Sequence, residues 1–121
     1  MTMHTKYKGH LGEFVAIALL YLKGYRILER RYKTACGEID IIAKRGNTVV
    51  FVEVKARKNV EKCFLAINPK QMNRIRQASL VFLRRNPRLA DSELRFDVIL
   101  VAEHWIPRHI QNVDLPAAGN L

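Results

Sequence analysis

The stretch from Gly37 to Arg57 constrains the fold more than any other part of this 121-residue chain. It reads GEIDIIAKRGNTVVFVEVKAR, and its two apolar runs flank the dipeptide Gly46-Asn47. Such a dipeptide between apolar runs is a strong signal for a two-residue hairpin turn. We therefore expect two antiparallel strands, over residues 37–44 and 48–55, that are joined by a tight turn.

The position of the turn decides which side chains face each other across this hairpin. If Gly46 is the first turn residue, Asp40 lies directly opposite Glu53, and Glu38 lies opposite Lys55 on the same face. Directly opposed residues have Cβ atoms only about 4.5–5.5 Å apart. Two carboxylates held that close repel each other unless a proton or a cation lies between them. A turn centred one residue earlier would instead place Glu38 opposite Glu53.

Charged residues on strands often form only a solvated sheet face, and Glu38 with Lys55 would then be a simple cross-strand ion pair. The neighbouring residues favour a buried site. Asp40 precedes the apolar residues 41–43, and Glu53 lies inside the run VVFVEV. Such runs suit strands that are covered on both faces, where an acid is costly unless it binds something. Two acids beside a lysine therefore indicate the chemistry of a divalent-metal phosphodiester site.

The charge of the chain is concentrated in one segment. The formal net charge is +10. Residues 55–90 hold ten basic residues and one acid, Glu61, so this segment carries +9 and the remainder +1. A clustered basic field favours a polyanionic partner, of which nucleic acid is the usual one, over a merely soluble basic surface.

Composition excludes several classes of protein. Apolar residues make up 49% of the chain, which is typical of a globular domain and not of a disordered one. Cys36 and Cys63 have no metal-ligand spacing, and we expect both to be reduced thiols. The longest apolar run, residues 14–22, is too short to span a membrane. Residues 1–10 are polar and basic, unlike a secretory signal, so we expect a single cytoplasmic domain without membrane contact.

Local patterns predict the remaining elements. Helical spacing of apolar residues predicts a helix over 11–23, which is apolar nearly all round and therefore expected to be buried. Residues 1–9 show no period and are expected to form a loose lead-in. Asn68-Pro69 is a clear helix start, and we expect that helix to end near Arg85. The segment 59–67, between the hairpin and this helix, is expected to be an irregular, mobile loop.

Three more strands complete the prediction, over residues 25–33, 94–101 and 104–110. Pro107 favours an edge position for the last of them. His104 and His109 have no partner at metal-ligand spacing, so we expect edge or loop histidines, and Trp105 is expected to pack. Residues 116–121 are expected to fray. The helix between the third and fourth strands is long enough for a parallel crossover, so we expect an α/β domain with a mixed sheet flanked by helices, in the order αβββαββ.

The central stretch also resembles a known family. Asp40, followed after a turn by Glu53-x-Lys55, has the form of the PD-(D/E)xK nuclease signature, with Ile39 in place of the usual proline. The pair GEIDIIA and FVEVKAR is similar to the YraN family of predicted endonucleases, which in turn is similar to archaeal Holliday-junction resolvases. The resemblance covers about residues 12–112. It implies a restriction-endonuclease-like core, a Mg²⁺ or Mn²⁺ cofactor and a DNA substrate, and it raises the prospect of a homodimer.

The resemblance also implies roles for individual residues. Asp40, Glu53 and Lys55 match the signature, and Glu13 matches a helical glutamate that assists metal binding. The expected metal ligands are Asp40, Glu53, the carbonyl of Val54 and Glu13. The residues expected to meet the DNA backbone are Arg57, Lys58, Lys62, Lys70 and Arg74. Expected flanking residues are Glu38, Gln71, Arg95 and Asp97, of which the last two could equally form a purely structural pair.

The sequence therefore predicts a metal-dependent endonuclease acting on DNA, with branched or repair intermediates suggested only by the likeness to resolvases. The alternative is a non-cleaving nucleic-acid-binding or interaction module of the same fold. Acids on a DNA-binding surface weaken binding unless a cation neutralises them, which favours the enzyme.

Overall fold

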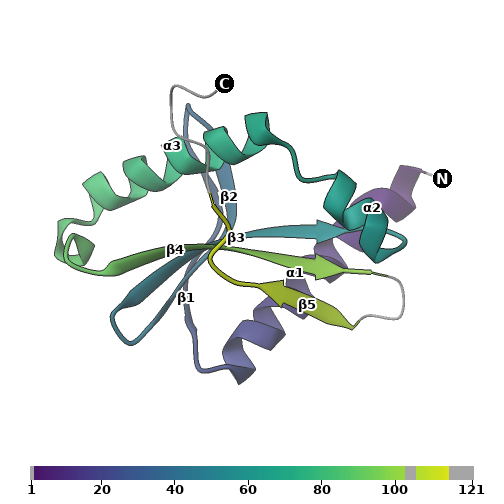
Figure 1. Ribbon diagram of the computed structural model, residues 1–121, viewed down its shortest axis with the longest axis horizontal. Helices are drawn as coiled ribbons and strands as arrows, with labels where there is room; N and C mark the ends of the chain where they lie inside the picture. The colour runs from purple at the N-terminus through teal and green to yellow at the C-terminus, as the bar shows by residue number, and fades with distance from the viewer. Residues whose placement is uncertain (1, 103–105, 115–121) are drawn as a thin grey trace.

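A five-stranded mixed sheet forms the centre of the molecule, with its strands in the order β1-β2-β3-β4-β5 (Figure 1). The computed structural model describes residues 2–102 and 106–114, and for residues 2–9 it describes the backbone alone. In chain order the elements are α1 (Thr2–Leu22), β1 (Arg26–Lys33), β2 (Glu38–Arg45), β3 (Thr48–Ala56), α2 (Val60–Leu65), α3 (Pro69–Arg85), β4 (Glu93–Val101) and β5 (Pro107–Ile110). A short 3-10 turn, Pro87–Leu89, precedes β4.

The predicted hairpin is present, and its register is the one set by a turn at Gly46. Arg45 pairs with Thr48, and the ladder continues inward to Ile41 and Val52. Gly46 has a φ of 59°, a conformation that costs glycine little. The first three strands of the predicted order thus form an antiparallel meander, and β3 then pairs with β4 in parallel across the crossover that contains α3.

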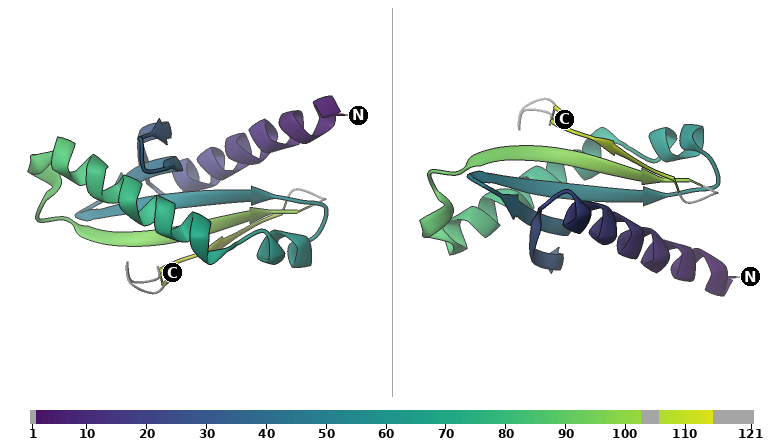
Figure 2. Two further views of the ribbon diagram at one scale, coloured as in Figure 1. Left: turned by 90° about the horizontal axis from the view of Figure 1, so that it is seen from above. Right: turned by 90° about the horizontal axis from the view of Figure 1, so that it is seen from below.

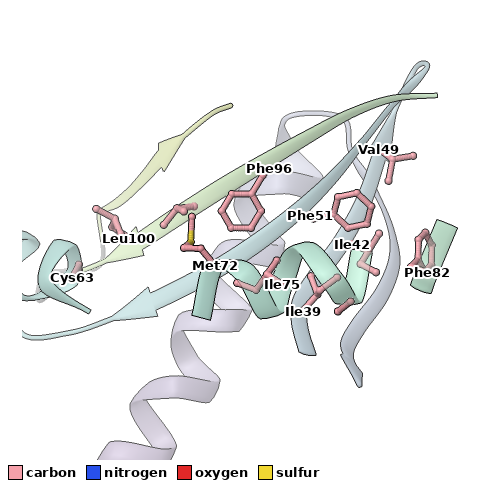
Figure 3. Close-up of a cluster of buried hydrophobic side chains, with 12 residues drawn as sticks. Ile39, Ile42, Val49, Phe51, Cys63, Met72, Ile75, Phe82, Phe96 and Leu100 are labelled. Atoms are coloured by element: carbon pink, nitrogen blue, oxygen red, sulfur yellow. The ribbon is translucent and has the colours of Figure 1, made fainter. Parts of the chain in front are cut away.

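Helices cover both faces of the sheet, α3 on one and α1 on the other (Figure 2). The face under α3 carries one apolar cluster, drawn in Figure 3, in which Phe51 and Phe96 meet Ile75 and Phe82 of the helix. The face under α1 carries a second cluster, where Ala16 and Leu20 pack on the strands. Both faces of β2 and β3 are therefore buried, as their near-continuous apolar sequences predicted.

Helix α1 differs from its prediction in two ways. It begins at Thr2 and not at Leu11, so the expected loose lead-in is helical. Figure 2 shows these first turns leaning away from the sheet, which explains why they carry no apolar period. The rest of α1 is also not buried all round, because Phe14 is 58% and Tyr21 75% exposed. The stripe around Ala16 and Leu20 packs on the sheet.

The segment 59–67 was expected to be an irregular loop and instead forms the short helix α2. The side-chain oxygen of Asn59 caps the helix by accepting a hydrogen bond from the Lys62 amide at 2.8 Å. Cys63 anchors it, because this side chain is fully buried in the cluster under α3. Six residues are too few to show a helical period, so the capping asparagine was the usable signal.

The remaining elements follow their predictions. Helix α3 begins at Pro69 behind the N-cap Asn68, whose side chain accepts from the Gln71 amide, and ends at Arg85. Strand β5 lies at an edge of the sheet and begins with Pro107. The expectations for His104, Trp105 and residues 116–121 lie outside the described residues. No helix among the described residues is long and apolar enough to cross a membrane.

Candidate active site

Asp40 lies where strand β2 stops pairing with β3. The last backbone pair is Ile41 with Val52, and beyond it the Oδ2 of Asp40 accepts a hydrogen bond from the Val54 amide at 2.8 Å. The Asp40 side chain thus replaces a backbone acceptor where the backbone hydrogen bonds between β2 and β3 end. The inward and outward alternation of β2 also breaks here, since Ile39 and Ile42 both pack under α3 while Ile41 packs under α1. This irregularity places the Asp40 carboxylate against β3, which also carries Glu53 and Lys55 and is called the site strand below.

Glu53 lies beside Asp40 and is only 5% exposed. Burial is the largest reason that its pKa is raised, and the hydrogen bond and negative charge of Asp40 raise it further. The Lys55 ammonium and the Val54 amide lower it, but the pKa of Glu53 still reaches about 9. At neutral pH Glu53 therefore holds a proton beside Asp40, which relieves the repulsion expected when no cation lies between two opposed acids.

Lys55 points to the same face as Glu53, two residues along β3. Its Nζ donates a hydrogen bond to Oε1 of Gln71 on α3 at 2.6 Å. The same Nζ lies 3.9 Å from Oε2 of Glu53. The expected opposition of Glu38 and Lys55 is not present, because β2 and β3 separate beyond Ile41. Glu38 pairs with Lys33 of β1 instead and is exposed.

Gly37 allows the start of β2 to approach α3 closely. A Cβ at this position would lie 2.6 Å from the Arg74 carbonyl oxygen, closer than real Cβ contacts allow. Beside this contact the surface is hollowed over about 370 Å³, a volume lined by Glu38, Asn68, Lys70, Gln71 and Arg74. Gln71 lines this hollow and also contacts Lys55 of the site. The sequence offered only the glycine itself as a signal for this approach.

A row of exposed cations borders the site. Arg57 and Lys58 follow β3, Lys62 lies on α2, and Lys70 and Arg74 lie on the first turns of α3. Helix α2 is tied to the site strand by Cys63, whose Sγ lies 3.4 Å from the Lys55 carbonyl oxygen. The five residues expected to meet DNA thus stand on consecutive segments of the chain, around one end of β3.

Glu13 lies on α1 and so on the other layer of the molecule. Its Oε1 accepts a hydrogen bond from Nε of Arg31 at 2.9 Å, and its side chain is 16% exposed. No group of three or more His, Cys, Asp or Glu side chains is placed to hold one ion among the described side chains, those of residues 10–102 and 106–114. The structure therefore brings Asp40, Glu53 and Lys55 together and leaves Glu13 in an ion pair.

Arg95 and Asp97 face α1, on the side of the sheet opposite Glu53. Asp97 is fully buried, and its two carboxylate oxygens each accept a hydrogen bond from Arg95 at 2.9 Å. The carboxylate also accepts from the Asn112 amide at 3.0 Å and from Nε2 of His109 at 2.7 Å. Arg95 also contacts the hydroxyl of Tyr25. These contacts favour the structural interpretation of the pair and do not support a flanking role at the site.

His109, expected to be an edge or loop histidine, is part of this buried network with a side chain only 3% exposed. It does lie on the edge strand β5. Its Nδ1 lies 2.8 Å from Nζ of Lys23, and because an ammonium only donates, Nδ1 accepts and Nε2–H donates to Asp97. Burial alone would raise the pKa of Asp97, but the hydrogen bonds from His109, Arg95 and Asn112 hold it at about 2.

Together, the mixed sheet, the flanking helices and the acids at the end of the hairpin define an α/β protein compatible with a restriction-endonuclease-like core. Residues 12–101 match the model of the uncharacterised protein family UPF0102. The chain belongs to this family, which is the YraN family of nuclease-like proteins, as the resemblance of the hairpin sequence predicted.

Curated relatives agree with this family assignment. A UPF0102 protein of Rhodopseudomonas palustris is 51% identical over 102 residues, which cover 84% of this chain and 78% of the relative. A UPF0102 protein of Bradyrhizobium sp. is 49% identical over 102 residues, covering 84% and 75%. A UPF0102 protein of Mesorhizobium japonicum is 46% identical over 105 residues, covering 87% and 84%. These names state a family and no activity.

Proposed function

We propose that the protein is a metal-dependent endonuclease acting on DNA phosphodiester bonds. The observation that carries this proposal is the pairing of the half-buried Asp40 with the buried Glu53, whose carboxyl groups interact, while the Lys55 ammonium lies 3.9 Å from Glu53. A purely structural hairpin gains nothing from two acids that repel each other in an apolar setting. A site that exchanges their shared proton for a cation explains both acids.

Mg²⁺ or Mn²⁺ would be held by Asp40, Glu53 and the carbonyl of Val54. The donors fit, because these hard cations prefer oxygen ligands and Mg²⁺ commonly takes one or two carboxylates with water in the other positions. The Val54 amide points at Asp40, and the amide and carbonyl of one strand residue face the same edge. Glu13 could join only by giving up Arg31. When bound, the cation would polarise a water molecule and offset phosphate charge.

The side chains of the site have separate tasks in this proposal. Lys55 orients the attacking water or stabilises the charge that develops on the phosphate. Gln71 holds the lysine in place through its 2.6 Å hydrogen bond without adding charge. The bordering cations, from Arg57 to Arg74, bind the phosphates on either side of the scissile bond. Since phosphate contacts release counterions, affinity for DNA should fall steeply as salt rises.

A nicking assay on supercoiled DNA tests the proposal. The wild type should convert the substrate in Mg²⁺ or Mn²⁺ and not in excess EDTA. Glu53→Ala and Lys55→Ala should each lose cleavage by at least about 100-fold. Asp91→Ala, an exposed acid at the far end of the sheet, is the matched control and should cleave as the wild type does. Equal cleavage by all variants would remove the site assignment. Binding without cleavage under every condition would favour the non-cleaving module.

Metal binding can be measured without any reaction. Isothermal titration of Mn²⁺ into the wild type at pH 7.5 should show binding with release of a proton, because the shared proton must leave the carboxyl pair. Asp40→Asn and Glu53→Gln should abolish this binding, whereas Glu13→Gln should weaken it little. Retained binding in both site variants would place the ion elsewhere.

A further inference from the structure

Helix α2 exposes two large apolar side chains at the edge of the candidate site. Phe64 is 47% and Leu65 75% exposed. The other apolar residues of this segment, Val60, Cys63 and Ile67, pack into or against the cluster under α3. Val60 and Cys63 lie three residues apart and form the inner face of α2, and Ile67 follows the end of the helix. Phe64 and Leu65 belong to neither apolar cluster.

The position of this pair is fixed relative to the site. Cys63, the residue before Phe64, is fully buried, and its Sγ lies 3.4 Å from the carbonyl oxygen of Lys55 and 3.8 Å from that of Val101. The Asn59 cap holds the other end of α2. Phe64 follows at one Cα–Cα step of about 3.8 Å. Helix α2 lies beside the end of β3 (Figure 1), and Lys55 is the second-last residue of that strand, so the apolar pair is held close to the site.

The surroundings of the pair indicate a polyanionic partner. Arg57, Lys58 and Lys62 precede it, Lys70 follows it, and all four are exposed. Glu61 is the one acid among these residues. An acidic protein would match the charges but would meet the two acids of the site next to them. An aromatic ring among cations is the arrangement with which proteins hold unpaired nucleic-acid bases, since the ring stacks on a base while the cations bind the backbone.

We propose that Phe64, supported by Leu65, stacks on an unpaired base, and that the protein thereby selects DNA in which unpaired bases adjoin a duplex. This inference rests on the proposed DNA endonuclease function and names its substrate class. In an intact duplex the bases are stacked on one another, and a side chain reaches between them only by unstacking a step. A fork, flap or bulge offers a base without that cost.

Fluorescence anisotropy in EDTA and low salt tests the inference without cleavage. Two DNAs are compared, an intact duplex and the same duplex interrupted by unpaired bases. The wild type should bind the interrupted duplex about tenfold more tightly, the order expected for stacking of one base. Phe64→Ala should reduce this ratio to about one, whereas Phe64→Tyr, which keeps a ring, should retain it. Leu22→Ala, at an 83% exposed position on α1, is the control and should retain it.

A second measurement reports stacking directly. A 2-aminopurine placed among the unpaired bases should lose fluorescence when the wild type binds, and Phe64→Ala should abolish this quenching while remaining folded by circular dichroism. Equal binding of the two DNAs by the wild type overturns the stacking role, and so does unchanged preference and quenching in Phe64→Ala. Phe64 and Leu65 would then be a contact surface for another protein. Absence of binding to either DNA, in EDTA and equally for the cleavage-deficient Lys55→Ala in Mg²⁺, overturns the proposed DNA function as well, so the two failures are distinct.

Discussion

The Nζ of Lys55 donates a hydrogen bond to Oε1 of Gln71 at 2.6 Å, which joins the site strand β3 to the first turn of α3. Gln71 is itself fixed, because its backbone amide donates to the side chain of the N-cap Asn68 at 2.8 Å. The lysine ammonium is therefore positioned by a neutral partner on one side and by the Glu53 carboxyl on the other. This arrangement makes Gln71 a positioning residue for Lys55.

Replacing Gln71 by Ala should reduce DNA cleavage by about 10- to 100-fold, the usual cost of losing a partner that orients a site residue. The Michaelis constant should change less than kcat, because the lost contact is to Lys55 and not to the DNA. Gln77→Ala on the same helix is the control and should cleave normally. A Gln71→Ala enzyme with full kcat would show that the lysine needs no such support.

Gly37→Ala should destabilise the protein by about 1–3 kcal/mol, because a Cβ at this position would lie 2.6 Å from the Arg74 carbonyl oxygen and force α3 away from β2. Urea unfolding measures the change. Gly46→Asn is the matched control, since nothing lies within 4 Å of a Cβ at that turn position and asparagine tolerates its φ of 59°. Equal midpoints for the two variants would contradict the close approach.

The pH dependence of stability should reveal the protonated carboxyl of Glu53. Its folded pKa of about 9 lies above the unfolded value of 4.5, so the folded state binds the proton more tightly. The associated stability is complete below the unfolded pKa and is lost as pH rises through the interval up to about 9. In EDTA, the free energy of unfolding of the wild type should therefore fall over this interval.

Glu53→Gln has no proton to lose and should flatten this profile, with the largest gain over the wild type at the alkaline end. The exposed Glu93→Gln should leave the profile unchanged. Urea unfolding at a series of pH values measures both variants. A wild-type profile that stays level up to pH 9 would mean that the two acids do not share a proton in solution.

Asp97 should give the opposite dependence. Its pKa is lowered from 3.8 to about 2, so its contribution to stability is present above the unfolded value and is lost as pH falls through the folded one. Asp97→Asn should cost about 3–5 kcal/mol at pH 7, because it leaves Arg95 and His109 without their buried anion. This cost should shrink at the acid end of the range.

Cleavage by the folded fraction of Asp97→Asn should be retained, since Asp97 and Glu53 face opposite sides of the sheet. Asp91→Asn, at an exposed position, is the control for stability. Loss of cleavage in a fully folded Asp97→Asn protein would instead link this buried network to the site.

Local signals explain the features that could be predicted. The Gly46-Asn47 dipeptide fixed the register of the hairpin, and the register brought Asp40 to Glu53. Asn68-Pro69 marked the start of α3 to the residue. These signals work because a turn or a cap is decided by a few adjacent residues.

Long-range contacts explain the features that could not. Glu38 does not lie opposite Lys55, because the backbone pairing of β2 with β3 ends at Ile41 and the Asp40 side chain accepts from β3 instead. Rules for strand pairing do not anticipate such a replacement. His109 lies 86 residues from Lys23 and yet contacts it, so its burial depends on how β5 docks. The outer face of α1 looked buried from its apolar residues alone, but Phe14 and Tyr21 on that face are 58% and 75% exposed.

The central position of β3 has a consequence for motion. This strand is hydrogen-bonded to β2 on one side and β4 on the other, under helices on both faces, so its backbone amides should be among the slowest in the protein to exchange with deuterium. Glu53 and Lys55 thus lie on the strand that we expect to unfold locally least often. Any adjustment to a bound strand must come from the periphery, where the exposed first residue of β2, Glu38, should exchange orders of magnitude faster.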